Sequence, residues 1–184
     1  MRASRMLLGL ALLLLLPFLS ASPANAAGLA SKKVWLHDVA VAMKPAIPYL
    51  DRRVARGGDH LAIVLDIDNT SLATHYAWPR PVRKTLAFAQ RAHELGVKVF
   101  FVTGRHQADA KAQRPKLRRA GYTVNGICGR GDGEGLVHSK VRCRTAIVAK
   151  GFTIIASVGN LPSDFRGGLY ERKFDLPDYG RRLS

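Results

Sequence analysis

Two aspartates stand two positions apart directly after an apolar run, a spacing that suits chemistry at a cation. Leu61–Leu65 consists of five aliphatic residues, which predicts a strand buried on both faces, and Asp66 and Asp68 follow it. Both carboxylates point to nearly the same side, and they repel each other unless a cation lies near them. We therefore expect a hard-cation site beside a nucleophilic or acid–base carboxylate. The plain alternative is an Asx turn with two solvated aspartates.

A second apolar run ends in residues suited to an oxyanion. Residues 97–102 predict another buried strand, and Thr103, Gly104 and Arg105 follow it. A hydroxyl, a glycine that allows close backbone approach and a guanidinium together suit a phosphate group. Taken alone, these three residues also fit an ordinary glycine turn into the next helix.

Two further segments offer groups of the same kinds. Asn160 and Asp164 follow a predicted strand at 153–158. A carboxylate there could share a cation with Asp66, because hard divalent ions prefer oxygen ligands. Lys140 lies in the first turn of a predicted helix, where a cation opposes the helix dipole. That position is tolerated more easily if Lys140 faces a phosphate or a carboxylate cluster; the alternative is one more surface lysine.

Four predicted strands must position these groups, at residues 61–65, 97–102, 122–127 and 153–158. They alternate with predicted helices at 31–56 (interrupted at Pro45 and Pro48), 81–95, 107–120 (split at Pro115) and 139–150. This alternation predicts an α/β fold with a Rossmann-like parallel sheet sandwiched by helices. Ligands of such sheets bind outside the carboxyl ends of the strands, so three polar signatures should meet on one rim. No segment is long enough for a large cap domain, and we expect an open site.

The first 26 residues have the pattern of a secretory signal peptide. A basic start, a short apolar run and a closing Ala24-Asn25-Ala26 predict cleavage after Ala26 and secretion. The apolar run is shorter than the ~20 residues of a spanning helix, which argues against a membrane anchor. Residues 27–184 are then expected to form one domain, with a helical leader at 31–58, a catalytic core at 59–170 and a basic tail at 171–184.

The formal net charge of +16 fits two alternatives. One is a solvated cationic surface, and the other is weak, salt-sensitive attraction to phosphate-bearing substrates or anionic envelope surfaces. The basic residues form scattered clusters, such as 114–119 and 142–144, and no recognised nucleic-acid module is visible. We therefore expect no specific binding of nucleic acid.

Cys128 and Cys143 are the two cysteines of the chain. After export into an oxidising compartment, such a pair is expected to form one disulfide. Closing so short a loop adds on the order of 3 kcal/mol to stability. A reactive thiol or a metal site is the minor alternative, because two cysteines without nearby paired histidines make a poor zinc set.

Two aromatic residues follow the first motif in an irregular stretch. Tyr76 and Trp78 lie just before two prolines. They could form an apolar wall for the leaving group of a substrate. The alternative is that they seal the edge of the core, and the sequence does not separate these two interpretations.

The ordered set of polar segments resembles a known superfamily. Its members here are Asp66-Ile67-Asp68-Asn69-Thr70-Ser71, Thr103-Gly104-Arg105, Ser139-Lys140-x-x-x-Arg144 and Gly159-Asn160-x-x-Ser163-Asp164. They resemble the four motifs of the haloacid dehalogenase (HAD) superfamily, and most of all its secreted acid phosphatases of subfamily IIIB, which include the class B and plant vegetative-storage types. The resemblance covers about Leu61 to Gly168. The first motif is specific by itself, whereas the second and third gain weight from the order.

This resemblance implies a Mg²⁺-dependent phosphomonoesterase that forms an aspartyl-phosphate. Asp66 would attack phosphorus, and Asp68 would protonate the leaving oxygen and then activate water. Thr103 and Lys140 would hold the phosphoryl oxygens. The implied magnesium ligands are Asp66, Asp68 through its backbone carbonyl, Asn160 and Asp164, and the further phosphate contacts are Asn69, Thr70, Gly104 and Arg105.

One position departs from the superfamily pattern. Asn160 stands where an aspartate is common, and its neutral amide oxygen should bind a metal more weakly than a carboxylate. Asp164 would compensate by direct or water-mediated coordination. The alternative to an active phosphatase is therefore a catalytically weakened protein of the same fold that binds or stores phosphate-bearing or anionic ligands. Nucleotides, sugar phosphates and aryl phosphates all fit an open site.

Overall fold

The computed structural model describes residues 29–183 of the chain. The predicted signal peptide, residues 1–26, lies outside the described residues. Within residues 29–183, no helix has both the length and the apolar character that crossing a bilayer requires.

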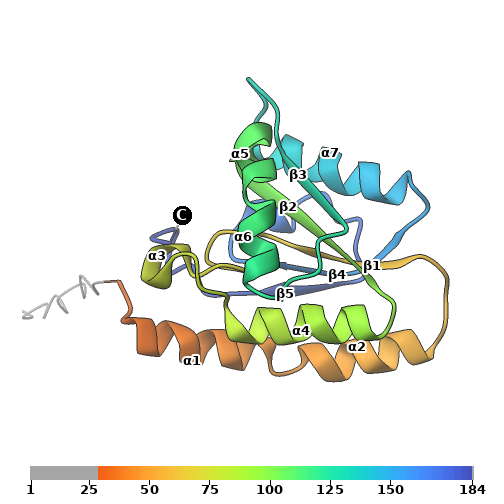
Figure 1. The fold of residues 1–184 in the computed structure, drawn as a ribbon, viewed down its shortest axis with the longest axis horizontal. Coiled ribbons are helices and arrows are strands. Elements are labelled where there is room, and N and C mark those ends of the chain that lie inside the picture. The colour runs from red at the N-terminus through yellow and green to blue at the C-terminus, as the bar shows by residue number, and fades with distance from the viewer. Residues whose placement is uncertain (1–28, 184) are drawn as a thin grey trace, which may run out of the picture.

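The chain forms a five-stranded parallel sheet, which confirms the predicted α/β fold (Figure 1). The strands follow the spatial order β3-β2-β1-β4-β5. Their bounds are β1 Leu61–Leu65, β2 Lys98–His106, β3 Gly126–Arg130, β4 Thr153–Gly159 and β5 Arg172–Asp175. The central strand β1 is buried along its whole length, as its five aliphatic residues predict. Its carboxyl end therefore lies between those of β2 and β4.

Helices cover both faces of the sheet (Figure 1). The helices are α1 Lys32–Met43, α2 Ala46–Ala55, α3 Thr74–Ala77, α4 Arg83–Glu94, α5 Gln107–Ala112, α6 Arg114–Arg119 and α7 Leu136–Val148, with a 3₁₀ turn η1 at Pro162–Asp164. α1, α2 and α4 lie on one face and α7 lies on the other, while α5 packs against β2 and β3. No large cap domain interrupts the described chain, as predicted.

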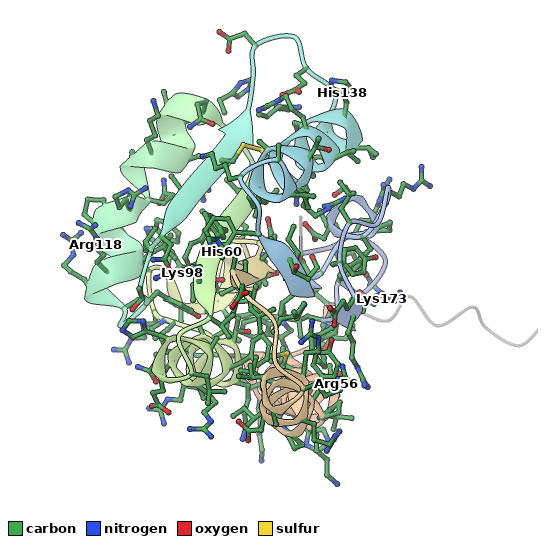
Figure 2. The ribbon with its side chains drawn as sticks, turned by 90° about the vertical axis from the view of Figure 1, so that its right-hand side faces the viewer. Arg56, His60, Lys98, Arg118, His138 and Lys173 are labelled. Carbon is green, nitrogen blue, oxygen red and sulfur yellow. A yellow bond between two sulfur atoms is a disulfide. The ribbon has the colours of Figure 1, made fainter. Side chains whose placement is uncertain are left out.

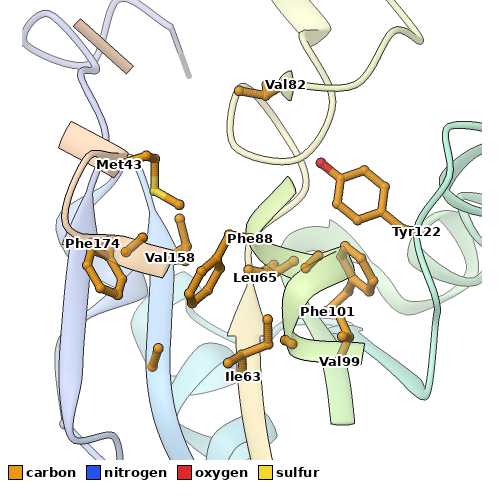
Figure 3. Packing of buried hydrophobic residues seen from close by; sticks show 14 of the residues in the cluster. Met43, Ile63, Leu65, Val82, Phe88, Val99, Phe101, Tyr122, Val158 and Phe174 are labelled. Carbon is orange, nitrogen blue, oxygen red and sulfur yellow. The ribbon is translucent and has the colours of Figure 1, made fainter. Parts of the chain in front are cut away.

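Two apolar layers hold the helices to the sheet. The larger layer joins α1, α2 and α4 to one face of the sheet, and Phe88 of α4 meets Phe174 of β5 with ring centroids 5.6 Å apart (Figure 3). The smaller layer places Cys143 and Ile147 of α7 against the other face. Because β1 alternates between the two layers, Ile63 belongs to the first and Val64 to the second.

Two strands differ from their predicted bounds. β2 continues to His106, so Thr103 and Arg105 lie within the strand and not after it. β3 begins at Gly126, whereas the prediction placed a strand at 122–127. The apolar residue Tyr122 instead turns into the core and donates its hydroxyl proton to the Ser71 carbonyl, 2.8 Å away. The prediction took this inward-pointing side chain for part of a strand.

Two other segments also differ from the prediction. The predicted basic tail contains β5, an edge strand whose Phe174 is buried while its charged neighbours are exposed. Helix α2 begins at Ala46, so Pro48 lies inside the helix and does not interrupt it. Proline is tolerated there because a first-turn backbone N–H has no partner within the helix. Pro115, by contrast, does stand at the predicted split between α5 and α6.

The predicted disulfide is present between Cys128 and Cys143 (Figure 2). Cys128 lies in β3 and Cys143 in α7, so the bond ties the edge of the sheet to the helix that carries Lys140. The loop between them is held by a second link, in which Arg142 donates two hydrogen bonds to Glu134 at 2.7 and 2.8 Å.

Candidate active site

A cleft of about 410 Å³ opens at the carboxyl ends of the strands. Seven of the residues singled out in the sequence line it: Asp66, Asp68, Asn69, Gly104, Arg105, Lys140 and Asn160. They come from the turn after β1, from β2 and α7, and from the residue after β4, segments far apart in sequence. The sheet therefore brings the predicted signatures together on one rim, as parallel α/β topology requires.

A buried triad of charges lies at and beneath the floor of the cleft. Lys140 Nζ lies 3.1 Å from Asp66 Oδ1 and also donates to Asp164 Oδ1. All three side chains are at most 6% exposed. Lys140 is thus the cation that faces a carboxylate cluster, not one more surface lysine. A buried charge is tolerated only when it is paired, and here one ammonium compensates two carboxylates.

Burial and pairing act in opposite directions on the acid groups of this triad. Burial raises the pKa of Asp66 to about 7; Lys140 lowers it, and Asp164 and Asp68 add to the rise. Burial alone would lower the pKa of Lys140, but Asp66 and Asp164 outweigh it and raise the pKa above its ordinary value. Lys140 therefore stays protonated. Any additional positive charge beside Asp66 would favour its ionised, nucleophilic form.

The second aspartate of the motif is held in one orientation at the cleft wall. Arg105 makes a bidentate pair with Asp68, with Nε–Oδ2 at 2.8 Å and Nη2–Oδ1 at 2.7 Å. Thr74 Oγ1 donates to Asp68 Oδ1 at 2.8 Å. The sequence pattern suggested Arg105 as a phosphate contact; the structure shows that it fixes Asp68 while still lining the cleft.

Asp164 is anchored beneath the cleft by backbone donors. Its Oδ2 accepts hydrogen bonds from the amides of Asn160 and Leu161, at 3.1 and 2.9 Å. Gly159 has no side chain at the point of contact, where a Cβ would overlap the Asp164 carboxylate. The glycine before Asn160 is therefore required for close approach.

Arg144 fixes the loop that follows Asp164. The guanidinium is fully buried and donates to three carbonyls, those of Asp164, Arg166 and Gly168. Because all of its bonds go to the backbone of one loop, Arg144 acts on loop position and not on a substrate. These hydrogen bonds join the third motif to the loop of the fourth motif.

The remaining motif residues lie beside or below the cleft. Thr70 is fully buried and donates its hydroxyl proton to Asn160 Oδ1 at 3.3 Å, and Thr103 is 1% exposed. Asn69 adopts a left-handed φ of 52°, which asparagine tolerates better than most residues. Its amide donates to the Leu183 carbonyl and its Oδ1 accepts from the His75 amide at 2.8 Å.

The two aromatic candidates do not line the cleft. Tyr76 stacks on Trp35 with ring centroids 4.9 Å apart and donates to the Ala30 carbonyl, so it closes the edge of the core. Trp78 is 41% exposed, and its ring lies 5.4 Å from the Arg105 guanidinium carbon. Of the two interpretations, the structure supports the core-sealing one for Tyr76. Trp78 contacts Arg105, which lines the cleft, but does not line it itself.

The oxygen donors at the cleft floor fit a hard divalent cation. Asp66, Asp164 and Asn160 offer two carboxylates and one amide oxygen. The Asp164 oxygens already accept hydrogen bonds, but a carboxylate has lone pairs for further ligands. Within residues 29–183, no group of three Asp, Glu, His or Cys side chains could hold a metal, so a third ligand has to be the amide or a backbone carbonyl. The set suits a hard divalent cation, with weaker affinity than three carboxylates would give.

Five cleft residues were not anticipated from the sequence: Thr74, Arg130, Leu136, Leu161 and Leu183. Leu136 lies over the second motif, where a Cβ at Gly104 would come within 2.7 Å of its methyl group. Leu183 is far from every motif in sequence and reaches the cleft through its contact with Asn69. No local pattern marks these residues, because the fold alone brings them to the cleft.

Comparisons with known proteins agree with this geometry. A family model described as HAD superfamily, subfamily IIIB (Acid phosphatase), matches residues 74–182, more than half of the chain. Two solved structures of the class C acid phosphatase from Bacillus anthracis, one with tungstate bound, each match with a TM-score of 0.64 and 17% sequence identity, over 81% of this chain and 80% of that chain. At this identity the likeness shows the fold. No curated protein matches the sequence. The family match favours a phosphatase over a binding or storage protein.

Proposed function

The chain belongs to the acid phosphatases of HAD subfamily IIIB. From this premise we propose that it is a secreted, Mg²⁺-dependent phosphomonoesterase. In this proposal, catalysis proceeds through an aspartyl-phosphate on Asp66. The observation that carries the proposal is the buried contact between Lys140 and Asp66 at the floor of the cleft. The motif-bearing strand ends at this nucleophile, and Asp68 stands two residues further along.

In the first step, an Asp66 carboxylate oxygen attacks phosphorus and the bond to the leaving oxygen breaks. Asp68 gives its proton to that oxygen, so an alcohol departs. In the second step, water attacks the aspartyl-phosphate, Asp68 takes its proton, and inorganic phosphate leaves with the Asp66 carboxylate restored. Lys140 neutralises charge on the phosphoryl oxygens in both steps.

Asp66, Asn160 and Asp164, with the Asp68 backbone carbonyl, would hold Mg²⁺. When bound, the ion supplies positive charge between the nucleophile and the phosphoryl group, where most catalysis of phosphoryl transfer resides. The protein positions these oxygens by backbone hydrogen bonds to Asp164 and by the Gly159 close approach.

The substrate in this proposal is a small phosphomonoester, and the anion site is expected to accept other tetrahedral oxyanions. Tungstate, the ligand of one Bacillus anthracis structure, has that shape, and we expect it to compete with substrate. Secretion is supported by the signal-peptide pattern of residues 1–26 and by the disulfide, a bond typical of oxidising compartments. The net positive charge supports weak, salt-sensitive attraction to anionic envelope surfaces.

The test is hydrolysis of an aryl phosphate by residues 27–184, with Mg²⁺ and with EDTA. We expect release of the phenol with Mg²⁺, a large loss with EDTA, and activity at background for Asp66→Asn. Asp59→Asn is the matched control, because Asp59 is exposed just before the opposite end of β1; it should retain full activity. Metal-independent activity, or an active Asp66→Asn, would overturn the proposal.

A further inference from the structure

A second cavity, of about 500 Å³, lies between α1, α3 and the start of α4. It shares no lining residue with the catalytic cleft. Its volume is within the range of small-molecule sites in proteins. Trp35 lines it and is fully buried, and the adjacent Leu36 lines it while remaining 40% exposed. The cavity is thus an apolar recess that is open to solvent.

Three cations surround this recess. Lys32 of α1, Arg80, and Arg83 of α4 all line it and are exposed. Across residues 29–183, none of the three forms a salt bridge or a side-chain hydrogen bond, whereas Arg53, Arg91, Arg105 and Arg142 are each paired with a carboxylate. Positive charge without compensation around an apolar recess favours a ligand that is anionic at one end and apolar at the other.

Trp35 adds an independent observation. Its Nε1–H is buried and has no acceptor among the described residues. A buried indole N–H normally finds a partner, since an unpaired buried donor is costly. An acidic headgroup in the cavity would bring acceptor oxygens to Trp35, which lines its wall.

We propose that this cavity binds an anionic amphiphile, a single alkyl chain with a negatively charged headgroup of the fatty-acid kind. The alkyl chain lies against Leu36 and Ala77, and the headgroup lies among Lys32, Arg80 and Arg83, where it accepts from Trp35 Nε1–H. A polyanion without an alkyl chain would leave the apolar wall uncovered, and a neutral amphiphile would leave the cations uncompensated.

The test uses laurate below its micellar concentration, measured by calorimetry and by tryptophan fluorescence on residues 27–184. We expect saturable binding of laurate, with dodecanol and acetate each at least about tenfold weaker. The double variant Arg80→Glu with Arg83→Glu should weaken laurate binding at least about tenfold. The double variant Arg118→Glu with Arg119→Glu changes two exposed residues of α6 outside the cavity. It makes the same charge change and should leave binding within about twofold.

Circular dichroism and hydrolysis of an aryl phosphate show whether each variant is folded, because neither Arg80 nor Arg83 lines the catalytic cleft. Three results would overturn the proposal: no saturable laurate binding to the folded wild-type protein, equal binding of dodecanol, or equal weakening by the Arg118→Glu, Arg119→Glu control. The proposal does not depend on the phosphatase mechanism, so failure of either leaves the other standing.

Discussion

Helices α6 and α7 are both rich in basic residues, yet they use them in opposite ways. On α7, Lys140 and Arg144 are at most 1% exposed, and every described bond they make goes to a carboxylate or a backbone carbonyl near the cleft. On α6, Arg118 and Arg119 are exposed, and Arg118 lies at the periphery of the molecule (Figure 2). Similar composition therefore produces a charged core in one helix and a solvated face in the other.

The difference comes from what each helix faces. α7 packs on β2, β3 and β4, and its Lys140 meets Asp66 and Asp164, which supply the negative charge that lets a cation be buried. α6 meets the core through Leu117, and the buried acids of residues 29–183, Asp66 and Asp164, both pair with Lys140 of α7. In these two helices, a basic side chain is buried at the site only where carboxylates or backbone carbonyls accept its hydrogen bonds.

Lys140→Met is expected to have the largest effect of the substitutions that test the difference between α7 and α6. The substitution leaves Asp66 and Asp164 buried without a counter-charge, so we expect the free energy of unfolding to fall by about 4 kcal/mol. We expect kcat to fall by a factor of about 10² or more. Urea unfolding and steady-state kinetics measure the two. The matched Lys116→Met on α6 removes a contact 5.2 Å from the Trp78 ring and a 3.3 Å hydrogen bond to Gln113 Oε1. It should cost less than about 1 kcal/mol. Equal effects at the two positions would contradict the comparison.

Removing the disulfide tests the covalent support that α7 has and α6 lacks. The double variant Cys128→Ser with Cys143→Ser should lose about 3 kcal/mol of stability, because a short closed loop is released in the unfolded chain. Urea unfolding under non-reducing conditions measures it, with the reduced wild-type protein as the control. If reduction left the wild-type midpoint unchanged, the bond would not stabilise the fold.

Arg144→Met tests the second buried cation of α7. It removes the donor to the carbonyls of Asp164, Arg166 and Gly168. Water can reach the exposed end of that loop, so we expect a stability loss of about 2 kcal/mol. We also expect a fall in kcat as Asp164 loses its support. Arg118→Met on α6 should change neither. A fully active Arg144→Met enzyme would separate the loop from catalysis.

The smallest effect concerns Glu134, which precedes α7. Hydrogen bonds from Arg142 and from the Gly131 amide hold the pKa of Glu134 at about 2, below the ordinary 4.5. A depressed folded pKa stabilises the protein above the unfolded pKa, and this contribution is lost as the pH falls toward the folded value. Glu134→Gln should therefore have a lower Tm than wild type near pH 6, with a gap that narrows by about pH 3. A gap independent of pH, or the same pattern in the exposed control Asp132→Asn, would contradict this account.

Much of the sheet and of the site could be predicted because the signals are local. The aliphatic run of β1, followed by Asp66 and Asp68, predicts both the central strand and the position of the site. The edges were harder to predict. β5 has one buried apolar residue, Phe174, between exposed charges, so it resembles a tail. β3 contains Gly126 and Gly129, which resemble loop residues, although both are needed there because a Cβ would strike Phe100 or the Arg105 carbonyl.

The roles of the basic residues could not be assigned from the sequence for a physical reason. Whether a lysine is buried depends on acids that are distant in sequence, and Asp66 is 74 positions from Lys140. For the same reason Leu183, whose carbonyl binds Asn69 from 114 positions away, gave no signal at all.

The most direct measurement of the central claim is to locate the phosphoryl group on the protein during turnover. The Asp68→Asn variant should accumulate the intermediate with an aryl phosphate, because the good leaving group departs without an acid while water lacks its base. Acid quenching and peptide mass spectrometry should place the phosphoryl group on Asp66. The double variant Asp66→Asn with Asp68→Asn should yield no phosphorylated peptide. A phosphoryl group on another residue, or turnover by Asp68→Asn with no phosphorylated peptide, would contradict the account.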